Sequence, residues 1–271
     1  MLDIKKVYID TRFKTSDSVS DSDFYVELPL SINIHDKCIC YIDDIVLPVS
    51  WSMIDSRNNY VYLGLRIGAT IHELRVQMPN GNYNGFTFAS ALQTVINSVL
   101  TPYSTPVEVS YDNINNKITI TLHDEREEKV GELEIAMLED NFAATLYSIP
   151  LTEVRSINGI LMLKKTTVLF PELPKQFYLD MHTTHNLYLT STSLGSFNTI
   201  SNFNCDCIIK KIPVRYNYNE MLFDSAEAGY DYLDLGRSTI SRIDFRLLDS
   251  MGHVVDLNGN HWSFSLVFLE K

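Results

Sequence analysis

The sequence lacks a long hydrophobic run and an excess of basic charge. No stretch of about 18 apolar residues occurs, so we expect no membrane span. The N-terminus has no apolar core after its first charges, so no signal peptide is expected. The chain has 22 basic and 34 acidic residues, a formal charge of −12. Because such a surface repels phosphate backbones, direct binding of duplex DNA is not expected.

Motifs of nucleotide binding and hydrolysis are also missing. The sequence has no Gly-x-x-x-x-Gly-Lys-Ser/Thr loop, no Gly-x-Gly-x-x-Gly fingerprint and no Gly-x-Ser-x-Gly elbow. Carboxylate pairs occur at Asp43 with Asp44 and at Asp231 with Asp234, but 34 acidic residues produce such pairs by chance. A β-sandwich hydrolase would need clustered acids or a metal in a cleft. We therefore expect no enzyme, no catalytic or cofactor-binding residue and no cofactor.

Cysteine is scarce, and its spacing does not favour a metal site. The four cysteines form two Cys-x-Cys pairs, Cys38 with Cys40 and Cys205 with Cys207. Both pairs lie in alternating apolar runs, where residues i and i+2 point to the same face of a strand. Structural zinc sites usually separate their cysteines by two to four residues on a turn. We expect all four cysteines to be buried thiols on strands and not metal ligands. The protein is then expected to be made in a reducing compartment.

The other polar clusters are expected to have structural or solvated roles. His182 and His185 are spaced as loop histidines and do not share one face of a strand. Asp17, Asp21 and Asp23 lack the glycine and distal glutamate of a calcium-binding EF-hand. Three lysine pairs are expected to be solvated at strand ends, where they discourage edge-to-edge aggregation: Lys5–Lys6, Lys164–Lys165 and Lys210–Lys211.

Aromatic residues are plentiful, with 15 Tyr and 13 Phe against 11 Gly and 9 Pro, a composition that favours strands. Residues 1–23 are expected to form an N-terminal arm that ends in a polar Ser/Asp-rich stretch. From Phe24 onward apolar and polar residues alternate, which predicts strands at 24–28, 37–47 and 60–67. Three strands without an intervening helix indicate antiparallel β-structure.

The middle of the chain has a different pattern. Phe88 begins a series of apolar residues at helical spacing up to position 99, with Thr87 as the expected N-cap. A hairpin is predicted from 107–111 and 118–122, followed by a strand at 133–137 and a short helix at 141–147. We interpret residues 68–165 as an α+β module inserted between strands of a sandwich.

Alternation then returns and persists to the last residues. It predicts seven further strands, at 177–181, 186–190, 207–214, 221–224, 232–235, 240–248 and 262–269. Residues 24–67 and 166–271 together supply enough strands for a mainly β protein, either a β-sandwich or a jelly roll. Trp262 is in phase with Phe264 and Phe268 and is expected in the core. Trp51 lies in a connection, where an interface role and a core role remain open.

Two sets of segments carry a resemblance to a known family. The first set comprises residues 8–18 (YIDTRFKTSDS), 22–24 (SDF), 40–48 (CYIDDIVLP) and 58–59 (NN). The second set comprises residues 185–189 (HNLYL), 193–196 (SLGS), 208–214 (IIKKIPV), 247–252 (LLDSMG) and 262–266 (WSFSL). These segments resemble the N-terminal and C-terminal regions of penton (minor capsid) proteins of Maverick/Polinton-type and virophage-like viruses. The two regions that they span, 8–59 and 185–266, make up about half of the chain, and the insertion is left largely unmatched.

The resemblance implies a single jelly-roll β-sandwich with two antiparallel sheets. It also implies a virion protein that forms homopentamers at icosahedral vertices, beside a double jelly-roll major capsid protein. Assembly would take place inside the host cell, and the insertion would project outward, where it could contact a host-surface receptor. The arm at 1–23 would order only against a neighbouring subunit, so its deletion would spare the fold. The alternative from another class is a jelly-roll carbohydrate-binding or host-attachment protein.

Overall fold

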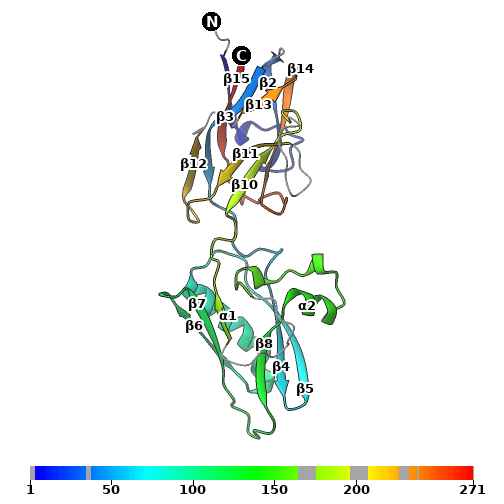
Figure 1. Ribbon diagram of the computed structural model, residues 1–271, viewed down its shortest axis with the longest axis vertical. Helices are drawn as coiled ribbons and strands as arrows, with labels where there is room; N and C mark the ends of the chain where they lie inside the picture. The colour runs from blue at the N-terminus through cyan, green and yellow to red at the C-terminus, as the bar shows by residue number, and fades with distance from the viewer. Residues whose placement is uncertain are drawn as a thin grey trace. The chain divides into compact units, whose positions relative to one another are not determined.

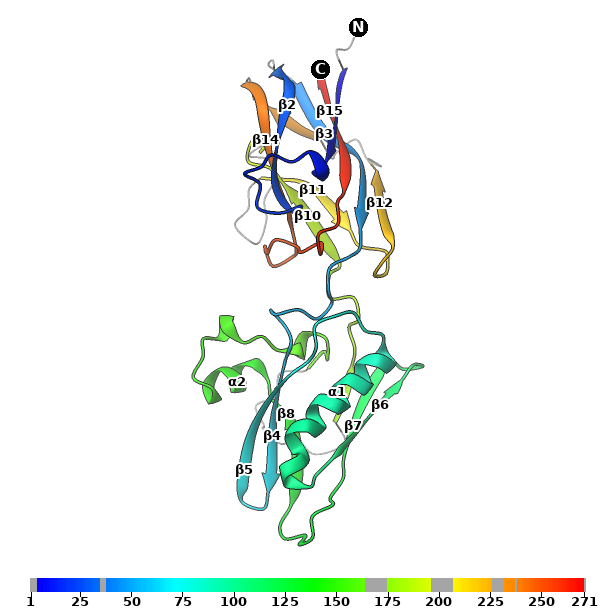
Figure 2. The ribbon, with the colours of Figure 1, turned by 180° about the vertical axis from the view of Figure 1, so that it is seen from behind.

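The computed structural model describes residues 4–34, 38–163, 175–195, 207–225, 232–236 and 238–270. The chain divides into two compact units, which Figures 1 and 2 show from opposite sides. The sandwich unit contains residues 1–51 and 184–271, and the insertion unit contains residues 52–183. The expected module borders, 68 and 165, therefore lie inside the insertion unit. The difference arises because strands near both borders pair within the insertion unit.

The sandwich unit contains two antiparallel sheets. The first has the spatial order β1 (Ile4–Asp10), β15 (Ser263–Glu270), β3 (Cys38–Pro48) and β12 (Met221–Ser225), with β13 (Tyr232–Leu235) also paired to β3. The second has the order β11 (Ile208–Pro213), β10 (Asn186–Thr190), β14 (Ser238–Leu248) and β2 (Asp23–Ile34).

The topology is that of a single jelly roll. If β12 and β13 count as one interrupted strand, the first sheet takes the first, eighth, third and sixth strands of the sandwich. The second sheet takes the fifth, fourth, seventh and second. This interleaving of two Greek keys characterises the jelly roll. The insertion joins the third strand, β3, to the fourth, β10. The predicted fold class, a mainly β single jelly roll with an α+β insertion, is confirmed.

The N-terminal segment differs from the expected arm. All seven residues of β1 pair with β15, from Ile4 opposite Leu269 to Asp10 opposite Ser263. The loop after β1 is packed against the last strand, because Trp262 donates its indole N–H to the Asp21 carbonyl at 2.6 Å. Residues 4–22 are thus the first strand and first loop of the sandwich. An edge strand with one buried side chain has little alternation, which explains why its sequence resembles an arm.

The sandwich core is rich in aromatic side chains. Phe24, Phe245, Trp262 and Phe264 are all buried between the sheets, and their rings meet at centroid distances of 4.9 to 5.9 Å. Tilted, edge-on and stacked ring contacts of this kind stabilise the core beyond the burial of apolar area. Trp262 is therefore a core residue, as the alternation predicted.

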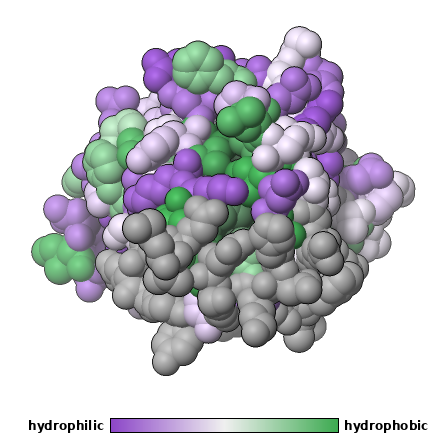
Figure 3. Space-filling view, turned by 90° about the horizontal axis from the view of Figure 1, so that it is seen from above, coloured by the Kyte–Doolittle hydropathy of each residue, from purple (hydrophilic) through white to green (hydrophobic). Residues whose placement is uncertain are grey.

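The two ends of the sandwich unit differ. Both termini lie at one end, because Ile4 pairs with Leu269 (Figure 1). Seen from the side of the termini, hydrophobic residues gather near the middle of the described surface, among hydrophilic ones (Figure 3). At the other end the connection after β3 is held by loops of the same unit. The Val49 N–H donates to the Glu220 carbonyl at 2.9 Å, and Ser50 Oγ donates to the Leu257 carbonyl at 2.8 Å.

The described residues of the insertion unit form two three-stranded sheets and two α-helices. One sheet has the order β5 (Thr70–Gln77), β4 (Tyr60–Ile67) and β8 (Leu133–Met137), and the other β6 (Val107–Asp112), β7 (Lys117–Leu122) and β9 (Lys175–Tyr178). The helices are α1 (Gly85–Leu100) and α2 (Asp140–Leu146). The strand predicted at 60–67 pairs with β5 and β8, so it belongs to this unit.

Helix α1 shows why this region folds as it does. It begins three residues before the expected start: Asn84 is the N-cap, and Thr87 completes a capping box with it. The apolar face of α1, including Phe88, Leu92 and Ile96, is buried in the unit's core. The side-chain oxygen of Asn97 accepts the Val107 N–H at 2.7 Å, so the helix also occupies part of the free edge of β6.

Candidate functional sites

The cysteines do not form a metal site in the described chain. Cys38 and Cys40 are buried thiols on β3, and burial raises the pKa of Cys40 far above its ordinary value. Cys207 is a half-buried thiol beside β11, and Cys205 lies outside the described residues. Within the described ranges no group of three or more His, Cys, Asp or Glu side chains could hold a metal ion.

The other candidate residues are also kept apart. His182 and His185 lie in the connection between β9 and β10, as expected for loop histidines. Asp43 and Asp44 lie on β3 and have different partners: Asp43 contacts Lys6 at 2.6 Å, and Asp44 accepts a bond from Ser265. Asp234 lies on β13, and Asp231 is not among the described residues. Trp51 is half-buried against the sandwich core.

Asp17 and Asp21 in the first loop and Asp23 at the start of β2 are engaged in ion pairs. Asp17 contacts Arg242, Asp23 contacts Arg246 at 3.3 Å, and Asp21 contacts Lys14 at 2.8 Å and His261 at 2.9 Å. Burial alone would raise the pKa of Asp21, but hydrogen bonds from Lys14 and His261 outweigh it and lower the pKa. These carboxylates fix the loop to the sandwich and do not converge on one point.

Lys210 is the lysine for which the expectation was wrong. Lys210 is 6% exposed, and its Nζ lies 3.4 Å from Oδ2 of Asp224 on β12. The ion pair therefore links an edge strand of one sheet to an edge strand of the other. The position of Lys210 opposite the buried Leu189 places its side chain on the inner face of β11. Inward-pointing charge on an edge strand is one way to prevent edge pairing. Lys164 and Lys165 are not among the described residues.

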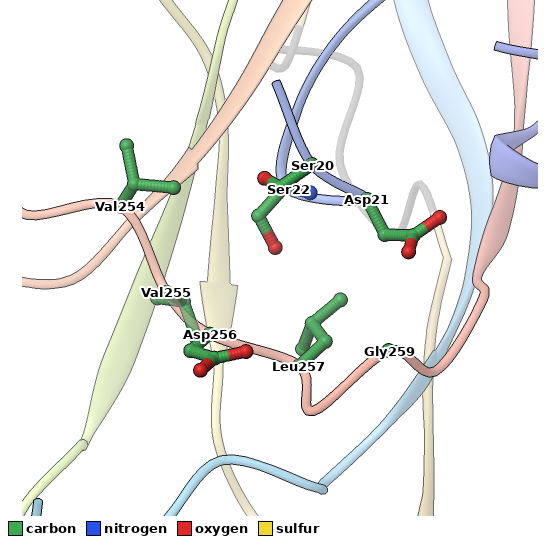
Figure 4. Close-up of a pocket in the computed structure, with 8 residues that line it drawn as sticks. All are labelled: Ser20, Asp21, Ser22, Val254, Val255, Asp256, Leu257 and Gly259. Carbon is green, nitrogen blue, oxygen red and sulfur yellow. Dashed lines mark hydrogen bonds between the residues drawn. The ribbon is translucent and has the colours of Figure 1, made fainter. Parts of the chain in front are cut away.

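A hollow of about 330 Å³ lies between the first loop and the connection from β14 to β15 (Figure 4). Ser20, Asp21 and Ser22 line one side, and residues 254–257 with Gly259 line the other. The Asp21 carboxylate is held by Lys14 and His261, and Asp256 accepts the Asn258 N–H at 2.8 Å. The described lining contains no nucleophile paired with a base, so the hollow offers no constellation for acid–base or covalent catalysis.

The outer face of the first sheet is the most distinctive surface of the sandwich unit. Tyr8 on β1 is 77% exposed and Phe223 on β12 is 61% exposed, whereas the neighbouring Ile9 and Leu222 are buried. Exposed aromatic side chains therefore lie at both edges of this face. On the second sheet the outward Arg242 and Arg246 instead pair with carboxylates of the same unit. An exposed aromatic ring on an edge strand is available for contact with another chain. The alternation of apolar and polar residues could have predicted that Tyr8 and Phe223 face outward. It could not have predicted that the described chain leaves both side chains uncovered.

No protein-family model and no curated protein matches this sequence. Solved structures do match along almost the whole chain. The mavirus penton protein aligns with a TM-score of 0.53 at 10% identity, over 98% of this chain and 99% of that chain. A chain from the cryo-EM structure of the Sputnik virophage aligns with a TM-score of 0.53 at 16% identity, over 99% and 98%. The resemblance found in the sequence is thus confirmed at the level of the fold.

The described residues contain no helix that could span a membrane. In the described parts of the chain, neither α1 nor α2 reaches the length and apolar character that crossing a bilayer requires.

Proposed function

We propose that this chain is a structural virion protein, a minor capsid (penton) subunit that forms homopentamers at the vertices of an icosahedral shell. The observation that carries the proposal is the full-length match in fold to the mavirus penton protein, which includes both the jelly roll and the insertion. In this proposal the neighbour in the shell is a double jelly-roll major capsid protein, and the protein acts in the virion without catalysing a reaction.

The two edges of the first sheet support assembly into a ring. A ring of identical subunits requires two different contact surfaces on each subunit, because every contact is head-to-tail. Tyr8 and Phe223 lie on the first and last strands of the sheet order β1-β15-β3-β12, so both edges carry an exposed aromatic side chain. The opposite ends of the sandwich also differ, since one carries the termini and the other carries the connection to the insertion.

The mass and symmetry of the purified chain test the proposal. Light scattering should give five times the mass of the monomer, and particle averaging should show five-fold rings. The variants Tyr8→Ser and Phe223→Ser should each reduce the pentamer population without unfolding the chain. Phe86→Ser is the matched control, because Phe86 is 60% exposed on the insertion unit. Rings of another order, or a pentamer insensitive to both sandwich variants, would contradict the proposed surfaces.

The second candidate is a jelly-roll carbohydrate-binding or host-attachment protein. Exposed aromatic residues on the insertion unit favour it, since Phe86 and Tyr178 are 60% and 55% exposed and flat rings can stack on sugars. Glycan-array binding by a monomer or trimer, lost in Phe86→Ala or Tyr178→Ala, would support this function and overturn the penton proposal. A pentamer that binds a receptor through its insertion units would instead have both functions, as a penton and as an attachment protein.

A further inference from the structure

Both edges of the second sheet of the sandwich unit are protected against another chain. The first loop covers the edge of β2: the Thr15 N–H donates to the Tyr25 carbonyl at 2.9 Å, and the Tyr25 N–H donates to Ser18 Oγ at 3.0 Å. The edge strand β11 carries the inward-pointing Lys210. Covering an edge and placing a charge inside it both hinder pairing with a further strand.

The edges of the first sheet are open by comparison. β1 pairs with β15, and β12 pairs with β3. Within the described ranges, no backbone hydrogen bond reaches the far side of β1 or of β12. Tyr8 and Phe223 project from these strands on the outer face, while their neighbours Ile9 and Leu222 face the core. An open, regular edge of this kind is a template for a strand of another chain.

The strand directions fit pairing between two copies of this chain. In the order β1-β15-β3-β12 every neighbouring pair is antiparallel, so β12 runs opposite to β1. Subunits of a ring are related by rotation about one axis. When this axis lies along the strands, β1 points the same way in every copy. The β12 strand of one copy then runs antiparallel to the β1 strand of the next.

The register within the sheet brings the two exposed rings close to each other. Tyr8 lies opposite Ser265 on β15. Ser265 lies opposite Asp44 on β3, and Asp44 lies opposite Ser225 on β12. Rotation about an axis along the strands therefore places Tyr8 of one copy beside Ser225 of the next. Phe223 is two residues from Ser225 on the same face, in the diagonal position about 7–8 Å away, which aromatic side chains can reach.

The charges of the two edges are complementary. Lysine on an edge strand disfavours pairing with an unselected strand, and β1 carries Lys5 and Lys6. The register places Lys6 level with Tyr232 on β13, and Asp234 lies two residues farther along the same face. In the next copy Lys6 therefore meets an aromatic ring and a carboxylate, both of which attract an ammonium group.

We propose that the first sheet continues from subunit to subunit, with β1 of one copy paired antiparallel to the edge formed by β12 and β13 of the next. This inference rests on the proposed penton function and names the contact that closes its ring. Each subunit offers one edge and receives the other, so the contact is head-to-tail. Backbone hydrogen bonds join the copies, and the side chains of Tyr8 and Phe223 cover each other.

Disulfide trapping in the full-length chain tests this contact. The variant Tyr8→Cys/Ser225→Cys places one thiol on each edge, at exposed positions where the fold should tolerate it. Mild oxidation should give a covalent ladder that ends at the pentamer on a non-reducing gel and disappears on reduction. A mixture of the two single variants should give only a dimer with one copy of each. Tyr8→Cys/Lys211→Cys is the matched control, because Lys211 is exposed on the edge strand β11, and it should form no ladder.

The outcomes separate this contact from the proposed function. Five-fold rings in a variant that gives no ladder would overturn the contact and leave the penton function in place. A ladder from a chain that forms rings of another order would support the contact and overturn the pentamer. A chain that forms neither a ladder nor rings would overturn the contact, as would a Tyr8→Cys/Lys211→Cys control that is trapped equally well.

Discussion

The sandwich unit and the insertion unit are built in opposite ways along the chain. In the sandwich, β3 pairs with β12, β13 and β15, and β2 pairs with β14, so each sheet joins strands from both sides of the insertion. In the insertion unit, sequence neighbours pair, as β4 does with β5 and β6 with β7. The sandwich therefore depends on its most distant segments, whereas most of the insertion unit forms from local contacts.

The largest effect should come from deleting residues 1–10, which removes β1. The sandwich then loses its first strand and the burial of Ile9, and the long edge of β15 becomes unpaired. Because this sheet spans both halves of the chain, we expect loss of the cooperative unfolding transition of the sandwich. The insertion unit should keep its own transition. Circular dichroism and calorimetry of the truncated chain would measure both.

The reverse experiment replaces residues 52–183 with a short Gly/Ser linker. The connections at both ends of the insertion are held by backbone hydrogen bonds of the sandwich. The Val49 N–H donates to the Glu220 carbonyl, and the Val214 N–H donates to the His185 carbonyl. We expect this shortened chain to keep the sandwich transition. Two outcomes would contradict this difference between the units. One is a truncated chain that keeps the sandwich transition, and the other is a linker variant that loses it.

Truncating one core ring in each unit should produce matched, separate effects. Phe245→Ala removes a ring that contacts Phe24 and Phe264 in the sandwich, and Phe88→Ala removes the fully buried ring of α1. Each substitution should cost about 3–5 kcal/mol of unfolding free energy in its own unit. Calorimetry should show the sandwich transition fall in the first variant and the insertion transition in the second. A shift of both transitions in either variant would show that the units unfold together.

The sequence predicts elements well and their partners poorly, for a physical reason. Alternation in 243–247 reveals a strand because only one of its faces is buried. Val61, Leu63 and Leu65 alternate in the same way, and either core could produce this pattern. The sequence therefore cannot show that these residues belong to the core of the insertion unit. The inward position of Lys210 depends on Leu189 and Asp224, which are distant from it in the sequence. Such contacts leave no local pattern, so the Lys210–Asp224 pair could not be predicted.

A half-buried hydrogen-bond cluster should make the sandwich unit sensitive to acid. The Asp244 carboxylate on β14 accepts the backbone N–H groups of Thr192 and Ser193 at 2.9 and 2.8 Å. Burial alone would raise the pKa of Asp244, but bonds from Ser193 and Thr192 outweigh it and lower the pKa below 3.8. Its stabilisation is therefore present above about pH 4 and is lost as the pH falls through the lowered pKa.

Asp244→Asn should lower the stability of the sandwich near neutral pH by about 1.5–3 kcal/mol, the usual contribution of hydrogen bonds to a charged group. The difference from the wild type should shrink as the pH falls below about 4, because the wild-type carboxyl then becomes neutral too. Chemical denaturation at a series of pH values gives this difference directly. The insertion transition should be the same in both proteins, and a difference that grows in acid would refute the assigned sign.

The smallest predicted effect tests whether local structure decides the stability of the insertion unit. Asn84 caps α1 by accepting the Thr87 N–H at 2.9 Å, while the Thr87 hydroxyl accepts the Asn84 N–H in return. Asn84→Ala should lower the insertion transition by about 1 kcal/mol and leave the sandwich transition unchanged. Ser90→Ala on the exposed face of the same helix serves as the control and should change little. A cap acts only on its own helix, so Asn84→Ala should leave the sandwich transition where it is. A large shift of that transition would mean that the two units are coupled more strongly than their separate sheets and cores imply.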